Sequence, residues 1–273
     1  VRNEAALYAA RKGRDKVLPQ DFLDAVDRII GGLEKRTKII SEHEKKTIAF
    51  HEAGHAVVSW LVEFASPLVK VSIVPRGQSL GAAWYLPEER QITTTEQMLD
   101  EMCAALGGRA AEEIVFGKIS TGALSDLEKV TKQAYAMVSI YGLNEKIGNR
   151  SYYDSQGDQT FTKPYSEETS RIIDEEVGKL IEGAYQRAKD ILQSNYDKLS
   201  GLAESLLQNE VIFREDVQRI LGERPFGKPA EPEAKVEETE TDPGAEDAGA
   251  EDAGAEDAGA SDPSTGNDAA DET

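Results

Sequence analysis

The chain has 273 residues, which is enough for one large domain or two small ones with a buried core. Its formal charge is −20, and the segment from Glu231 to the C-terminus contributes −15 of this through sixteen acidic residues and Lys235. Residues 1–230 carry only −5, and this charge excludes a strongly basic nucleic-acid-binding protein. A single cysteine, Cys103, excludes a disulfide framework and a thiolate zinc cluster, and no apolar run approaches the 18 or so residues of a membrane span.

The first 30 residues predict a small helical hairpin. Residues 4–11 are strong helix formers, "KGRDKVLPQ" is a turn, and residues 19–30 follow as a second helix. Its apolar side chains are spaced as one helical face, consisting of Phe22, Val26, Ile29 and Ile30. The chain has no initiator Met and begins within a helical pattern, so we expect a soluble piece of a longer protein.

A longer helix is predicted from Ser41 to about Phe64, with Ser41 and Glu44 at the spacing of a capping box. Two strands follow, in residues 67–77 and 81–87. Val69, Val71 and Ile73 alternate in the first and should share one face. These strands predict a small, largely antiparallel sheet.

Helices resume with residues 93–117. Cys103 in this segment is predicted to be a small, buried, apolar residue, and a single cysteine fits a reducing compartment. Another helix should begin after "STGAL", where Ser125 and Glu128 again have capping-box spacing. Apolar positions spaced by three and four predict one or two long helices over residues 166–208, and "REDVQRIL" predicts a short one.

The expected fold is therefore mainly α, a helical domain with a small β-sheet. The composition changes after residue 226, where "GAEDA" occurs three times in succession among Pro, Ser and Thr. Such a segment has too few large apolar side chains to offset the entropy of ordering, which predicts a disordered acidic tail over residues 227–273.

The stretch "HEAGH" carries the clearest chemical signal. On a helix, His51 and His55 project from one face about a turn apart and can ligate one ion, with Glu52 beside them. This is the HExxH pattern of zinc-dependent peptidases, in which zinc activates a water and the glutamate accepts its proton. The alternative is a polar, surface-facing stripe on an amphipathic helix.

The surroundings of the two histidines favour a metal site over that alternative. Gly54 costs roughly 1 kcal/mol against Ala inside a helix, so it suggests that another group must approach the backbone closely. The neighbouring apolar residues are predicted to lie in the hydrophobic core, which places the histidines at the margin of the core. These residues are Ile48, Ala53, Val57, Trp60 and Leu61.

A catalytic zinc usually has three protein ligands, and the third is not a histidine here. His43, the only other histidine, lies about 12 Å along the same helix. Val58 and Leu61 stand where the metzincin extension would have Gly and His. A carboxylate must then complete the site. Glu112 or Glu113 and Asp126 are the candidates, and spacing does not choose between them.

Several segments in series resemble a known family. They are "NEAAL", "HEAGHAVV", "VSIVPRG", "YLPEE", "LGGRAAEEIVFGKISTGALSDLEKVT" and "NEVIFREDVQRILGERPF". Together they resemble the proteolytic module of the FtsH family of membrane-anchored, ATP-dependent zinc metalloproteases over residues 1–226. The closing "LGERPF" is most similar to the branch that includes the mitochondrial m-AAA proteases.

The resemblance implies a role for each site residue. The zinc ligands of the family fall on His51, His55 and Asp126, its general base on Glu52, and an acidic neighbour of the site on Glu112. One departure affects the second predicted strand. Ala82 stands where the family often has a larger apolar residue, which bears on substrate preference.

The resemblance also implies an organisation for the longer protein. Residues 1–32 would be the end of an AAA+ lid, 33–226 the zinc peptidase domain and 227–273 the tail. The expected protein is a homo-hexamer on an inner membrane, held by an N-terminal anchor absent from this chain, with this module on the cytoplasmic side. Its substrates are unfolded or membrane proteins. The chain has no GxxxxGK[ST] loop, so ATP would act only through an absent AAA+ module.

The function predicted from the sequence is a zinc endopeptidase with one catalytic Zn²⁺ and no nucleic-acid partner. A helical assembly module with a lapsed active site is the alternative. Every residue that the chemistry needs is present, which favours the enzyme.

Overall fold

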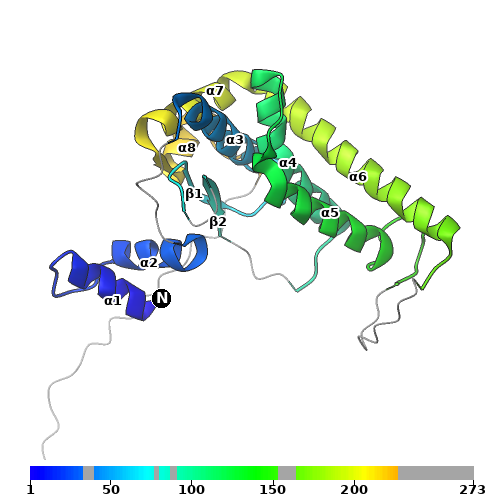
Figure 1. The fold of residues 1–273 in the computed structure, drawn as a ribbon, viewed down its shortest axis with the longest axis horizontal. Helices are drawn as coiled ribbons and strands as arrows, with labels where there is room; N and C mark the ends of the chain where they lie inside the picture. The colour runs from blue at the N-terminus through cyan, green and yellow to red at the C-terminus, as the bar shows by residue number, and fades with distance from the viewer. Residues whose placement is uncertain (33–39, 77–79, 87–90, 153–163, 227–273) are drawn as a thin grey trace, which may run out of the picture. The chain divides into compact units, whose positions relative to one another are not determined.

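The computed structural model describes residues 1–32, 40–76, 80–86, 91–152 and 164–226; the predicted acidic tail lies outside these residues. The described chain has the following helices and strands, most of which Figure 1 labels. They are α1 (Arg2–Arg11), α2 (Pro19–Gly31), α3 (Glu42–Leu61), β1 (Leu68–Ser72), β2 (Ala82–Tyr85), α4 (Thr95–Phe116), the 3₁₀ helix η1 (Thr121–Ala123), α5 (Leu124–Ser139), α6 (Glu167–Ser194), α7 (Tyr196–Asn209), β3 (Val211–Phe213) and α8 (Arg214–Leu221). The predicted class, mainly α with a small antiparallel sheet, is confirmed. Among the described residues, no helix combines the length and the apolar character needed to cross a membrane.

Helices α1 and α2 form the predicted hairpin. Small side chains close it, and those buried are Ala5, Ala9 and Ala25. Asp21 is also buried and accepts hydrogen bonds from the Leu18 backbone N–H at 2.9 Å and from the Arg14 guanidinium at 2.5 Å. On the apolar face predicted on α2, Phe22 and Ile29 are exposed and Val26 is half-buried. A two-helix hairpin covers only one side of each helix.

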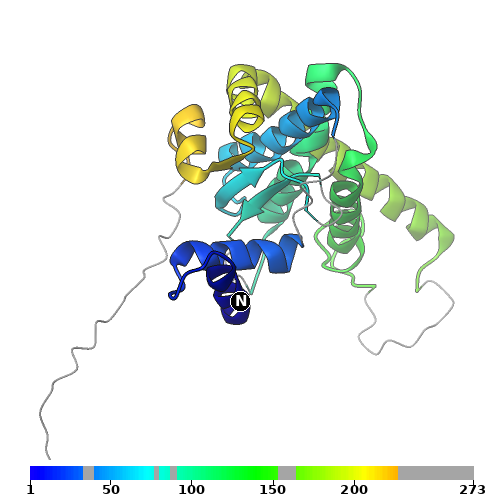
Figure 2. The ribbon, with the colours of Figure 1, turned by 60° about the vertical axis from the view of Figure 1, so that its left-hand side comes forward.

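Helix α3 begins as predicted, with both halves of the Ser41–Glu44 capping box formed, and it ends at Leu61. Every residue from Ile48 to Trp60 is buried. Helices α4, α6 and α7 and strands β1 and β2 all contact α3, so little of its circumference remains for solvent (Figure 1 and Figure 2). The surface-stripe interpretation of the two histidines is therefore wrong.

The crossing of α3 with α4 depends on two glycines. A Cβ added to Gly54 would lie 2.3 Å from the carbonyl oxygen of Gly107, and a Cβ on Gly107 would lie 2.6 Å from that of Gly54. The two backbones are thus closer than any side chain allows. The close approach predicted at Gly54 is confirmed, and its partner is α4.

The sheet has the order β2-β1-β3, with both pairs antiparallel. The sequence predicts β1 and β2 but not β3, whose three residues directly precede α8. The β1–β2 register shifts between Leu68 and Lys70. Val69 is 37% exposed as a result, whereas Val71 and Ile73 are buried. The prediction of one shared face is therefore wrong for Val69, because an irregularity interrupts the strict alternation of a strand.

Helix α5 starts differently from the prediction. Ser120 caps the short η1 turn by accepting a hydrogen bond from the Gly122 backbone N–H at 3.1 Å, and η1 leads directly into α5. The N-cap of α5 is Ala123, without a side-chain hydrogen bond. Ser125 lies inside the first turn, so the predicted Ser125 cap is wrong. Asp126 is in the first turn, as expected.

The C-terminal part of the described chain holds the end of α3. Residues 166–208 form two helices, which separate at Asn195. Beyond α8, the Gly222 carbonyl accepts a hydrogen bond from the Trp60 indole at 3.1 Å. Arg224 donates to three carbonyl oxygens that follow α3, at 2.8 to 3.2 Å; they belong to Val62, Glu63 and Ala65. A cation at this helix end also interacts favourably with the helix dipole.

We expect Gly54→Ala to lower the free energy of unfolding by about 1 to 3 kcal/mol or more, since its methyl group would displace the α4 backbone. Gly183→Ala on α6 is the matched control, because a Cβ there meets nothing within 4 Å. That variant should be stabilised by up to about 1 kcal/mol. Urea denaturation of both variants measures this difference. Equal stability of Gly54→Ala and the unmodified chain would contradict the close crossing.

Candidate metal centre

Three side chains from α3 and α5 converge at one point. His51 Nε2 and His55 Nε2 lie 3.1 Å apart, and Asp126 Oδ2 lies 3.4 Å from the first and 3.5 Å from the second. Both histidines are buried, and Asp126 is partly buried. Among the described residues, these three make up the group of histidine and carboxylate side chains that could hold a metal ion.

The spacing of the three atoms fits zinc. A tetrahedral ion with ligands at about 2.0 to 2.1 Å separates them by about 3.3 Å, which is close to all three sides of this triangle. Two imidazole nitrogens and a carboxylate are also ligands that zinc accepts. Space is left beside the nitrogens because residue 108 is a glycine. A Cβ there would lie 2.6 Å from each Nε2 atom.

The second ring nitrogens of the histidines are both held by α4. His51 Nδ1 lies 2.6 Å from Glu112 Oε1, and His55 Nδ1 lies 2.9 Å from the carbonyl oxygen of Ala104. Since both partners are acceptors, each Nδ1 carries the proton and each Nε2 is left free for a metal. Outer partners of this kind fix the tautomer and the orientation of a ligating imidazole.

The carboxylates considered as a third ligand have separate positions. Glu112 is buried and bridges two elements, since its Oε2 also accepts the Ser120 backbone N–H at 2.7 Å. Glu113 points to α6, where it bonds Tyr185 and accepts from Lys189 Nζ at 2.7 Å. Only Asp126, among these three, lies in front of both Nε2 atoms.

Glu52 is buried next to the group and faces β2. A Cβ on Gly81 would lie 2.6 Å from Glu52 Oε1, and the Ala83 backbone donates a hydrogen bond to the Glu52 carboxylate. Burial raises the pKa of Glu52 above its ordinary value, against the opposing attraction of His55 and His51. A carboxylate with a raised pKa is a better proton acceptor than an ordinary surface glutamate.

The charges around the histidines favour a cation. Burial lowers the pKa of His51, but hydrogen bonds to Asp126 and Glu112 outweigh it and raise this pKa to about 10. Burial alone would raise the pKa of Asp126, yet hydrogen bonds to the two histidines hold it well below its usual range. Three buried or partly buried carboxylates surround two imidazoles, so a proton or a metal ion is needed to balance them.

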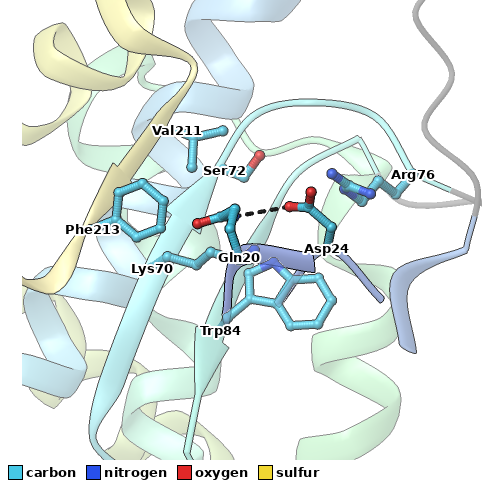
Figure 3. A pocket seen from close by; sticks show the side chains of 8 residues that line it. All are labelled: Gln20, Asp24, Lys70, Ser72, Arg76, Trp84, Val211 and Phe213. Atoms are coloured by element: carbon cyan, nitrogen blue, oxygen red, sulfur yellow. Dashed lines mark hydrogen bonds between the residues drawn. The ribbon is translucent and has the colours of Figure 1, made fainter. Parts of the chain in front are cut away.

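Away from the metal-ligating group, a pocket of about 210 Å³ is lined by other kinds of side chain (Figure 3). Asp24 and Gln20 of α2 are hydrogen-bonded at 2.9 Å on one side, and Lys70 Nζ lies 5.1 Å from the centre of the Trp84 ring on the other. Asp24 also forms an ion pair with Lys12 at 2.7 Å. None of the residues that line this pocket belongs to the metal-ligating group.

Sequence reasoning missed several residues of the site. Gly81, Gly107 and Gly108 are needed for close approaches, and Tyr85 donates a hydrogen bond to the His55 carbonyl at 3.4 Å. The pair Gly107–Gly108 inside a helical pattern was an available signal, because two glycines are costly in a helix interior. Its partners could not be read from the sequence. His43, which was excluded as a ligand, packs against Phe116 instead.

Comparison with known proteins identifies the family. The profile described as "Peptidase family M41" matches residues 38–220, a range that contains the whole His-His-Asp group, Glu52 and Glu112. The chain belongs to peptidase family M41. The predicted FtsH-like relationship is thereby confirmed, and the family is one of peptidases.

The chain matches only part of the length of each of its named relatives. "ATP-dependent zinc metalloprotease FtsH" of Parabacteroides distasonis is 65% identical over 225 residues, 82% of this chain and 33% of the relative. Its namesake in Rhodothermus marinus is 54% identical over 243 residues, 87% and 35% of the two chains. "Mitochondrial inner membrane m-AAA protease component AFG3L2" of Mus musculus is 50% identical over 240 residues, 88% and 30%. The chain spans about a third of the length of these relatives.

The raised pKa of His51 predicts a pH-dependent stability of the metal-free M41 chain. The folded pKa of about 10 exceeds the ordinary 6.5, so the stabilisation is complete below about pH 6.5 and is lost as the pH rises toward 10. Urea denaturation in chelator between pH 6 and 10 should show falling stability, and His51→Asn should give a clearly shallower slope. Equal slopes for the two proteins would contradict the assignment.

Proposed function

We propose that the chain is the proteolytic part of a longer ATP-dependent zinc protease and that it hydrolyses peptide bonds in unfolded polypeptides. His51, His55 and Asp126 would hold the zinc, Glu52 would act as general base, and Glu112 would position His51. The observation that carries the proposal is the buried Glu52 carboxylate beside a His-His-Asp group of zinc spacing.

Zinc held by His51, His55 and Asp126 would supply a Lewis acid for the activation of water. The chain's own residues do the remaining work. Glu52 accepts the proton of the attacking water and can return it to the leaving amine, a role for which its raised pKa suits it. Glu112 and Ala104 keep the two imidazoles from rotating. Burial of the site limits competing solvent.

The edge strand β2 is the proposed binding surface for the substrate backbone. In the described sheet, β2 pairs with β1 on one side only, and Ala83 in the strand and Gly81 just before it contact Glu52. An extended peptide added along the free edge would pass the general base, with main-chain hydrogen bonds giving affinity independent of sequence. Ala82 lies in this strand, and we propose that its small side chain bears on substrate preference.

The larger assembly is proposed from the relatives and the resemblance. Their names describe ATP-dependent proteases, one of them in an inner membrane. We propose that residues 1–32 end an AAA+ lid, that 33–226 form the peptidase domain and that 227–273 form a separate acidic tail. The intact protein would be a membrane-anchored homo-hexamer with this part on the cytoplasmic side, and its ATPase would deliver unfolded or membrane proteins.

Glu52→Gln is expected to abolish peptide hydrolysis while the chain keeps one zinc ion, because the carboxylate acts on the water and is not a ligand. Casein hydrolysis and metal content measure the two effects. Glu113→Gln, which removes the carboxylate that faces α6, is the control and should retain activity. Loss of zinc from Glu52→Gln would place Glu52 among the ligands and reject the assignment.

Asp126→Ala should lose zinc and activity together, whereas Glu112→Gln should keep metal at an affinity about 10 to 100 times lower, as for an outer partner of a ligand. Glu128→Ala, an exposed position on the same helix, is the matched control for Asp126. If Glu112→Gln is the metal-free variant, the third ligand has been misassigned. If even the unmodified chain binds no zinc, the alternative of a lapsed assembly module is correct.

The isolated chain should cleave unfolded polypeptides without ATP and should not be stimulated by it, since the printed sequence has no GxxxxGK[ST] loop to couple nucleotide hydrolysis to movement. A tightly folded substrate should resist, because only its rare open molecules reach the site. The test compares one substrate protein with a destabilised variant of it, each with and without ATP. Rapid cleavage of the folded form, or stimulation by ATP, would refute this reading.

A further inference from the structure

Gly108 of α4 faces the two histidines of the metal-ligating group. A Cβ on this residue would lie 2.6 Å from His51 Nε2, 2.6 Å from His55 Nε2 and 2.7 Å from His51 Cδ2. Real Cβ atoms do not approach other heavy atoms so closely, so any side chain at position 108 must displace both rings. The two nearest atoms are those that would bind the metal.

The rings have little freedom to move away from such a side chain. His55 Nδ1 is held by the carbonyl oxygen of Ala104, and His51 Nδ1 by the carboxylate of Glu112. Ala104, Gly108 and Glu112 are spaced by four residues and therefore lie along one face of α4. On this face, Ala104 and Glu112 each hold one imidazole, and Gly108 between them leaves space. The His51 and His55 rings of α3 pack against all three residues.

The helices cannot separate to make room either. Gly54 and Gly107 hold the α3 and α4 backbones together one residue away from Gly108, with a Gly54 Cβ only 2.3 Å from the Gly107 carbonyl oxygen. The two neighbouring glycines therefore have different tasks. Gly107 permits the helix crossing, and Gly108 keeps a space in front of the two nitrogens.

We propose that Gly108 is a positioning residue for the metal, whose missing side chain keeps open the space that both Nε2 atoms need for ligation. The inference rests on the proposed function, in which His51, His55 and Asp126 hold zinc. It assigns a task to a residue that neither ligates the ion nor touches the attacking water. A methyl group at position 108 would close the space and turn the imidazoles out of their ligating orientation.

The test compares zinc affinity with metal-free stability in Gly108→Ala. In chelator, the methyl costs hydrogen bonds of the displaced rings and the better helix propensity of alanine offsets only part of this loss, so the thermal unfolding midpoint should fall while the variant still folds. Zinc affinity, measured by competition with a chromophoric chelator, should fall at least 10-fold to 100-fold, the range seen when the partners of a ligating imidazole are removed. Gly183→Ala, a helix glycine with nothing within 4 Å, should bind zinc like the unmodified chain.

Cobalt provides a readout that a purely structural role would not change. At cobalt concentrations high enough to load Gly108→Ala, its visible absorption should differ from that of the unmodified chain and Gly183→Ala, because the imidazoles have turned. Unchanged zinc affinity in Gly108→Ala overturns the inference and leaves the proposed zinc site intact. Failure of Gly108→Ala to fold in chelator also overturns it, in favour of a packing role. Absence of zinc from the unmodified chain would overturn both proposals.

Discussion

The contact between the Gly54 and Gly107 backbones is the constraint on which the rest of the site depends. It brings α3 and α4 so close that side chains on each helix reach the backbone and side chains of the other. At this distance the His51 and His55 rings find their partners on α4 without any intervening loop. Two rigid helices are a more accurate support for a catalytic group than flexible loops, because the orientation of each imidazole is fixed by packing as well as by hydrogen bonds. The close packing of α3 against α4 thus lies where the positions of the imidazole rings must be most accurate.

The same closeness creates an electrostatic problem within the core. Two Nε2 atoms 3.1 Å apart each direct a lone pair at the other unless a cation lies near them. Glu52, Glu112 and Asp126 add negative charge at a place where burial makes every charge costly. Hydrogen bonds to Asp126 and Glu112 outweigh burial and raise the pKa of His51, so a proton on His51 balances part of this charge in the metal-free chain. A proton and a metal ion therefore compete for the same place between the histidines and carboxylates. Metal binding releases the proton, so metal affinity increases as the pH rises.

The sequence was sufficient for features that depend on neighbours along the chain. The Ser41 cap, the HExxH spacing and the helical class need only local geometry, and the class and the cap are confirmed. The third ligand stayed open among carboxylates until a family resemblance was considered, because the fold decides which of them faces the histidines. The errors at Val69 and Ser125 have local causes that a regular pattern hides, namely a register shift and a 3₁₀ turn before a helix. The tasks of Gly107 and Gly108 depend on the register between α3 and α4, whose facing glycines Gly54 and Gly107 are 53 residues apart in the chain (107 − 54), and no periodicity encodes this register.

The hydrogen bonds from Arg224 to the end of α3 have a consequence for biosynthesis. The guanidinium reaches the Val62 carbonyl across 162 residues of sequence, and β3 joins β1 over a similar span. At about 5 to 20 residues per second, a ribosome needs roughly 8 to 30 s to make that stretch. For the later part of this interval, from the synthesis of Asp126 until that of β3, the nascent chain contains His51, His55 and Asp126 but lacks the strand and the arginine that complete their scaffold. The ligands are thus made before the elements that complete their scaffold, so the site takes its final geometry only after nearly all of the described chain has been synthesised.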